Sequence, residues 1–274
     1  LAAGGLMILQ GGAFAAGVYP PLKAVGNSWF TQSPGGDTVA RYSPWFRLEQ
    51  DPLGRGFMVV RSWVSQADYA ANPIRASKSS ELKQDEDIAE WGQTYTYYWR
   101  HIIDPNWITY PDEENTIIWQ VHEVNGPAGV HRPTLECHLS GGQLIVMHTI
   151  DAYTLGIVVY QRAFTPGEEI HTYLRAKWAD GDHVADADGI LELYVNGALV
   201  WQINGQRNTW EPNPDIHPCY MVGGVYVPEQ FDWWAGRDRL CYLVGMCIGD
   251  SAETPESLRL HVEGGLATQG ATSA

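Results

Sequence analysis

The chain has 274 residues and a formal net charge of −15, with 45% hydrophobic but only 18% charged residues. This composition excludes a disordered chain and supplies enough apolar side chains for a sizeable core. The acidic excess argues against nucleic acid or an anionic membrane as a partner, because both require clustered Lys and Arg.

The chain starts with an apolar, glycine-interrupted segment, residues 1–25, and ends with a tail of small residues, 266–274. The first segment lacks the basic residues that open a secretion signal, and no run of about 18 apolar residues follows that would span a membrane. Ends of this composition fray unless they are held. We therefore expect two arms that contact a neighbouring chain, in a homo-oligomer or a larger assembly, and a domain over 26–265.

Between the arms, short runs of β-branched and aromatic residues alternate with turn signals. The dipeptide Asn196-Gly197 predicts a tight hairpin, while 66–73 and 81–91 are expected as short helices. No long stretch has a helical period and no linker divides the chain. The pattern predicts one all-β domain, a jelly-roll β-sandwich of two antiparallel sheets. The expected strands lie within 55–65, 93–103, 115–123, 143–150, 155–164, 170–181, 189–205, 219–227 and 239–249.

One predicted strand, residues 115–123, carries polar side chains inside an apolar run. Because side chains alternate along a strand, Gln120 and His122 point to one face while Trp119 and Val121 point to the other. A strand that buries one face and presents an amide and an imidazole on the other is either solvated there or lines a site.

Three short stretches, taken in order, resemble the motifs of jelly-roll polysaccharide lyases. These are "SSELK" (79–83), "QVH" (120–122) and "YMVGGVY" (220–226). Alginate lyases and the related glucuronan and heparin lyases carry R-[ST]-E-[LV]-R, Q-[IV]-H and Y-F-K-A-G-[VI]-Y on one concave sheet. The resemblance implies a concanavalin A-like sandwich. It also implies a carbon–oxygen lyase that cleaves an acidic, uronate-containing polysaccharide by β-elimination.

The chain departs from the family pattern at three basic positions. Ser79 stands in place of the first arginine, Lys83 in place of the second, and Val222 in place of the lysine. Two positive charges that would face an anionic sugar are therefore lost. The candidates to replace them are Arg75, Lys78 and Arg132.

The resemblance also assigns roles to residues. Gln120 would hold the sugar carboxylate, and His122 and Tyr226 would exchange protons, with either as the base and Tyr226 able to serve as both base and acid. Trp233 and Trp234, adjacent in a predicted loop, would either stack on sugar faces or contact another subunit. Substrate binding or support would fall to Tyr220, Glu81, Lys83 and Arg132, with Glu81 orienting a cation.

The two lost charges leave a second interpretation open. In it, the chain is a catalytically inactive glycan-binding or structural module of a larger assembly, such as a virion surface or tail component. Under both interpretations we expect an extracellular protein, either secreted or associated with a virion.

No sequence motif for a catalytic metal or an organic cofactor is present. The acidic stretches 111–115 and 180–189 do not match an EF-hand, and solvated turns are preferred over structural calcium sites. The cysteines, which show no zinc-ligand spacing, fit either two disulfides or four buried free thiols. They are Cys137, Cys219, Cys241 and Cys247.

Overall fold

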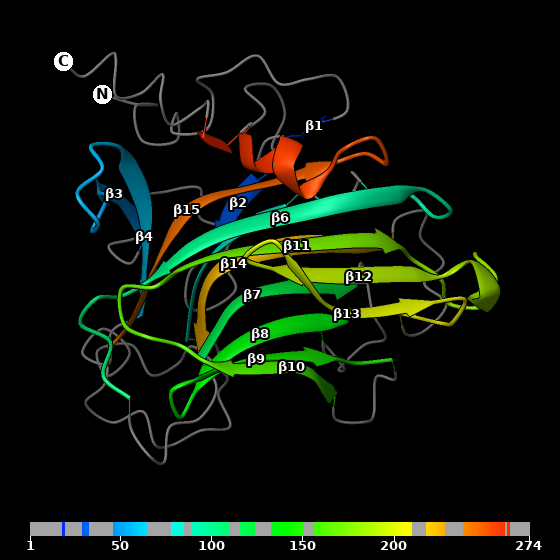
Figure 1. Ribbon diagram of the computed structural model, residues 1–274, viewed down its shortest axis with the longest axis horizontal. Coiled ribbons are helices and arrows are strands. Elements are labelled where there is room, and N and C mark those ends of the chain that lie inside the picture. Colours follow the sequence, from blue (N-terminus) through cyan, green and yellow to red (C-terminus); the bar gives the residue numbers. More distant parts are fainter. Residues whose placement is uncertain are drawn as a thin grey trace.

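The structure is a computed structural model in which almost all regular structure is β-strand (Figure 1). It describes residues 18–19, 29–32, 46–64, 78–84, 89–109, 116–123, 133–150, 156–209, 218–227, 238–260 and 262–263. Within these residues, two antiparallel sheets of eight and seven strands lie face to face. The predicted fold class, an antiparallel two-sheet β-sandwich, is confirmed.

Sheet A, the larger sheet, has the strand order β13-β12-β11-β6-β15-β4-β3, with β1 paired to β15 beside this path. Its strands are β1 (Val18–Tyr19), β3 (Phe46–Gln50), β4 (Met58–Val64), β6 (Thr94–Ile103), β11 (Glu169–Lys177), β12 (Ile190–Val195), β13 (Ala198–Asn204) and β15 (Arg239–Gly249).

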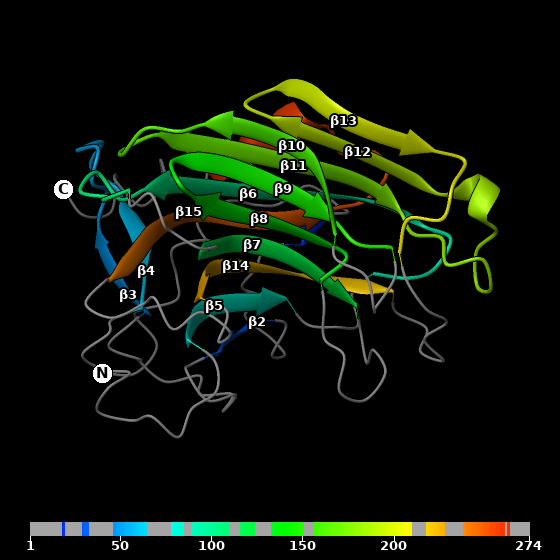
Figure 2. The same cartoon turned by 90° about the horizontal axis from the view of Figure 1, so that it is seen from below.

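Sheet B has the order β10-β9-β8-β7-β14-β5-β2, so that β7 and β14 occupy its middle. Figure 2 shows β8, β7, β14 and β5 side by side in this order. The strands are β2 (Trp29–Gln32), β5 (Lys78–Gln84), β7 (Thr116–Glu123), β8 (Leu135–Ser140), β9 (Gln143–His148), β10 (Ile157–Ala163) and β14 (Cys219–Val227). The strands that carry two of the three motifs are therefore direct neighbours.

Every predicted strand segment contains a strand, and the predicted hairpin joins β12 to β13. Asn196 and Gly197 have φ angles of 50° and 83°, the left-handed pair that a two-residue hairpin turn needs. The helix expected over 81–91 is wrong at its start, because residues up to Gln84 form β5 between β14 and β2. The helix expected over 66–73 lies outside the described residues.

The arm expected over residues 1–25 contributes β1 to its own domain. Val18 pairs with Gly249 and Tyr19 with Ile248 in an antiparallel ladder on β15. The rest of this arm and the tail 266–274 lie outside the described residues, and their contact with a second chain stays a prediction. In the part of the chain that is described, no helix is long and apolar enough to cross a membrane.

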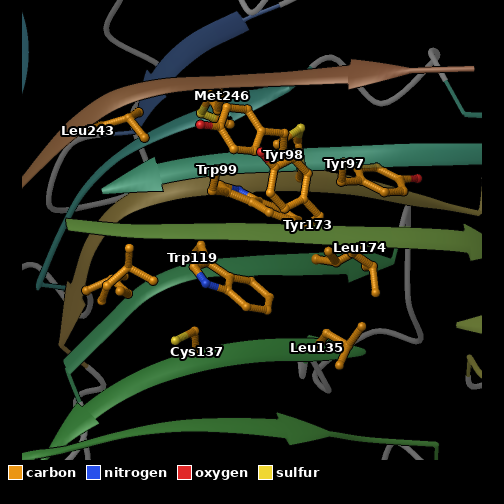
Figure 3. Packing of buried hydrophobic residues seen from close by; sticks show 14 of the residues in the cluster. Tyr97, Tyr98, Trp99, Trp119, Leu135, Cys137, Tyr173, Leu174, Leu243 and Met246 are labelled. Carbon is orange, nitrogen blue, oxygen red and sulfur yellow. The ribbon is translucent and has the colours of Figure 1, made fainter. Parts of the chain in front are cut away.

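The core lies between the two sheets and is rich in aromatic rings (Figure 3). Trp99 of β6 stacks on Trp119 of β7 with ring centroids 4.7 Å apart and an interplanar angle of 22°. The indole nitrogen of Trp99 also donates a hydrogen bond to the Val222 carbonyl of β14, at 3.0 Å. One sheet A side chain therefore contacts both central strands of sheet B.

The structure decides the state of the cysteines, which the sequence left open. Cys137, Cys219, Cys241 and Cys247 are all buried free thiols. Burial raises the pKa of the Cys137 thiol above its ordinary value, so this cysteine is an inert core side chain.

Candidate functional site

Strand β7 presents its polar residues on the face of sheet B that points away from sheet A, called here the outer face. Trp119 and Val121 belong to the core between the sheets, so Gln120 and His122 project to the outer face. Gln120 is 7% exposed, and the side chain of His122 is 14% exposed. The amide and the imidazole predicted to share a face do so, in a largely screened position.

Strand β14 places its own outer-face residues beside this pair. Its odd-numbered residues, among them Met221 and Val225, belong to the core, so Tyr220 and Val222 point outward. The ladder between β14 and β7 pairs Tyr220 with His122 and Val222 with Gln120. Directly opposite residues on antiparallel strands have neighbouring side chains, so these residues form one continuous cluster.

The rings of His122 and Tyr220 are stacked, with centroids 5.6 Å apart and an interplanar angle of 13°. His122 Nδ1 lies 3.2 Å from the backbone oxygen of Glu123. A carbonyl oxygen only accepts hydrogen bonds, so Nδ1 carries the proton in this contact. The neutral ring then has its lone pair on Nε2, which suits a general base.

Tyr226 shares the outer face with His122 but lies further along the sheet. It pairs with Ile117 on β7 and with Ser79 on β5, after a register shift that begins at Gly223. Ile117 and His122 are separated by five residues, or about 16 Å along a strand. The phenol next to the imidazole is therefore that of Tyr220, which the sequence had placed only among the supporting residues.

Side chains from sheet A hold the shifted segment of β14. Gly224 has a φ of 140°, a backbone conformation that residues with a side chain rarely adopt. The Val225 amide donates a hydrogen bond to Ser62 Oγ at 2.9 Å, and Cys241 Sγ donates to the Gly224 carbonyl at 3.5 Å. These contacts satisfy backbone groups that an irregular ladder leaves without a strand partner. They hold the backbone directly before Tyr226.

A carboxylate and a second imidazole adjoin the cluster from β8. Glu136 pairs in register with Gln120 and His138 with Ile117, and His138 Nε2 lies 2.9 Å from Glu136 Oε1. Neither residue was predicted to belong to the site. The alternation in 135–140, with apolar Leu135, Cys137 and Leu139, would have identified the strand and the face of both polar residues.

Glu123 ends β7 with a buried carboxyl group. It is 5% exposed, accepts a hydrogen bond from the Thr134 hydroxyl, and has Oε2 at 3.5 Å from His122 Nδ1. Burial raises its pKa well above the ordinary value, although the Thr134 hydrogen bond opposes the shift. The protonated, neutral form of Glu123 is thus favoured beside His122.

The first motif is placed by its backbone alone. The β5–β14 ladder pairs Ser79 with Tyr226, Glu81 with Gly224 and Lys83 with Val222, so all three motifs meet on adjacent strands of sheet B. Lys78 pairs with Val227 at the end of the same ladder. Four other candidates lie outside the described residues, namely Arg75, Arg132, Trp233 and Trp234.

The acidic segment 180–189 shows how its first carboxylate is satisfied. Asp180 accepts hydrogen bonds from the backbone amides of Asp182, His183 and Val184, and its Oδ2 lies 2.7 Å from His183 Nδ1. Among the described residues, no group of three or more His, Cys, Asp or Glu side chains is arranged to hold a metal ion. The acidic segment 111–115 lies outside the described residues.

Solved structures of polysaccharide lyases share this architecture. The endo-β-1,4-glucuronan lyase of the fungus Trichoderma reesei has a TM-score of 0.57 at 15% identity, over 81% of this chain and 94% of that one. A family 7 alginate lyase, solved with substrate after a histidine and a tyrosine had been substituted, has a TM-score of 0.56 at 15% identity, over 83% and 94%. An alginate lyase from Pseudomonas aeruginosa has a TM-score of 0.52 at 13% identity, over 82% and 99%.

Sequence comparison finds no such similarity. No protein-family model matches the chain, and no curated protein matches it. The likeness to the lyases is therefore a likeness of fold, and it confirms the jelly-roll architecture that the three short motifs implied.

Proposed function

We propose that the chain is a polysaccharide lyase that cleaves a uronate-containing polysaccharide by β-elimination on the outer face of sheet B. The observation that carries the proposal is the register that sets Gln120 and His122 beside Tyr220. An amide donor, an imidazole and a phenol are the groups this reaction needs. The fold shared with glucuronan and alginate lyases supports the assignment.

Each group has a defined task in the proposed reaction. The Gln120 amide donates a hydrogen bond to the carboxyl group of the sugar and stabilises the enediolate-like charge that develops there. His122 Nε2 removes the proton on C5, and the electron pair of that bond forms the C4–C5 double bond. The C4–O4 bond breaks, and a phenol supplies the proton that the leaving O4 takes up. Tyr220 is the nearer donor, and Tyr226 would contact a neighbouring sugar.

The alternative function is a glycan-binding or structural module without activity. It is favoured by the burial of the cluster, since Gln120 is only 7% exposed and Val222 only 2% exposed. A substrate would have to reach these side chains. The lyase and the glycan-binding module share the fold and the sugar-binding face, and they differ in whether a bond is broken. An extracellular location, secreted or on a virion, agrees with both.

The test is incubation of the protein with alginate, glucuronan and heparin, followed by ultraviolet absorbance of the double bond that elimination creates beside the carboxyl group. We expect absorbance to rise with at least one polymer, and we expect Gln120→Ala to lower the rate about 100-fold or more. The control variant is Gln202→Ala on β13 of sheet A, where the glutamine is exposed. Glycan binding without any absorbance rise would establish the module instead.

A further inference from the structure

The two strands beside Gln120 give it very different neighbours. On β14 the register partner is Val222, an apolar residue that is 2% exposed. On β8 the partner is Glu136, whose side chain is 16% exposed. A sugar carboxyl group that accepts a hydrogen bond from Gln120 would therefore lie between an isopropyl group and a carboxylate.

Among the described side chains, Glu136 brings a carboxylate close to that carboxyl position. Adjacent strands are about 4.8 Å apart, so Glu136 is one strand from Gln120. The backbone of Lys83, which pairs with Val222 from the other side, is two strands away. The Coulomb energy rises as two charges approach, so a carboxylate one strand away acts strongly on a second negative charge at Gln120. His138 faces Glu136 at 2.9 Å and belongs to the same pair.

We propose that the sugar bound at Gln120 carries its carboxyl group as a neutral ester, and that Glu136 sets this preference over a free carboxylate. This inference depends on the lyase function proposed above. It names Glu136 as a specificity-determining residue and an esterified uronate polymer as the substrate class.

The reaction chemistry favours the ester at such a site. Elimination from a free uronate builds a second negative charge on a carboxylate that is already anionic, and this dianion would form beside Glu136. Elimination from an ester starts neutral and develops a single charge on the carbonyl oxygen. The Gln120 amide donates a hydrogen bond to that oxygen, and the alkyl group of the ester packs against Val222. In both cases the C5 proton goes to the base and the O4 oxygen leaves protonated.

The experiment compares two forms of one polymer, methyl-esterified glucuronan and the same batch after de-esterification. We expect double-bond formation on the ester to exceed that on the free acid by about tenfold or more, from the Coulomb cost of a second charge at this distance. Equal rates, or a faster rate on the free acid, would overturn the inference and leave the lyase function standing. Absorbance on neither form, with alginate and heparin also unchanged, would remove the lyase function itself.

Variants assign the preference to its residue. Glu136→Gln keeps the shape of the side chain and removes its charge, so we expect the ratio of ester to free-acid rates to fall about tenfold. Glu192→Gln on β12 of sheet A is the matched control, and it should leave the ratio unchanged. Val222→Lys, which adds a positive charge beside Gln120, should also lower the ratio of ester to free-acid rates. A ratio that Glu136→Gln does not change, in a variant with the parent circular dichroism spectrum, would refute the role of Glu136.

Discussion

The imidazole of His122 and the phenol ring of Tyr220 are stacked across β7 and β14, with centroids 5.6 Å apart. Tyr226, on the same face, pairs with Ile117 instead. This difference in position separates the two tyrosines in a way that can be measured. In the proposed function, Tyr220 therefore takes the proton-transfer role that the motif pattern had implied for Tyr226.

Removal of the phenol hydroxyl from each tyrosine in turn tests that assignment. We expect Tyr220→Phe to lower the rate of double-bond formation about 100-fold or more, because a general acid contributes about that factor or more, while the stacked ring is kept. Tyr226→Phe should retain the rate within about tenfold and act mainly on KM. The measurement is kcat and KM on the best polymer. The reverse order of effects would return the proton-transfer role to Tyr226.

Loss of the Ser62 hydroxyl should destabilise the fold at the shifted segment of β14. Ser62 is fully buried and its Oγ accepts the Val225 amide hydrogen bond at 2.9 Å. Ser62→Ala would leave that buried amide without a partner, so we expect a loss of about 1–3 kcal/mol in the free energy of unfolding. Urea denaturation measures it. Ser251→Ala, in an exposed turn, should change the free energy by less than about 0.5 kcal/mol. An equally small effect at Ser62 would mean that the sheet ladder alone holds Val225.

The carboxyl group of Glu123 should make stability fall as pH rises. Its pKa in the folded protein is raised well above 4.5 by burial, so the folded state holds its proton where the unfolded state has lost it. The stabilisation is full below pH 4.5 and declines as pH rises towards the folded pKa. We therefore expect Glu123→Gln, which keeps an oxygen for the Thr134 hydrogen bond, to raise Tm increasingly from acid to alkaline pH. A Tm advantage that shrinks with pH would mean an ionised Glu123 paired with His122.

The buried imidazole of His101 should make stability fall as pH is lowered. Burial lowers its pKa from 6.5 to about 3, with the backbone of Ile118 opposing the shift. Between pH 6.5 and about 3, the unfolded state binds a proton on this imidazole and the folded state does not. Stability is therefore lost as pH falls below 6.5. At about pH 4 the loss is on the order of 3 kcal/mol. We expect His101→Leu to remove this acid-induced loss in urea denaturation at several pH values. Parallel pH curves for the two proteins would contradict the burial of His101 in neutral form.

Local pattern was sufficient for the strand segments that were predicted and for the face of β7 that carries Gln120 and His122. The alternation in 115–123 predicted that Gln120 and His122 share a face, and the Asn196-Gly197 turn predicted the β12–β13 hairpin. Both properties depend on residues a few positions apart, which is the range over which side-chain alternation and turn geometry act. The segment 81–84 misled for the same reason, because its helix-favouring residues are overruled by strand partners on both sides.

The neighbours of the cluster depended on tertiary structure. Whether Tyr220 or Tyr226 lies opposite His122 is a matter of register between strands about a hundred residues apart. The irregular segment at Gly224, between the two tyrosines, contacts Ser62 and Cys241 of the other sheet. Glu136 likewise becomes a neighbour of Gln120 only when β8 pairs with β7. The sequence by itself determined which side chains each strand presents. Long-range pairing decided which of them meet, because a shift of one residue between strands changes every cross-strand contact.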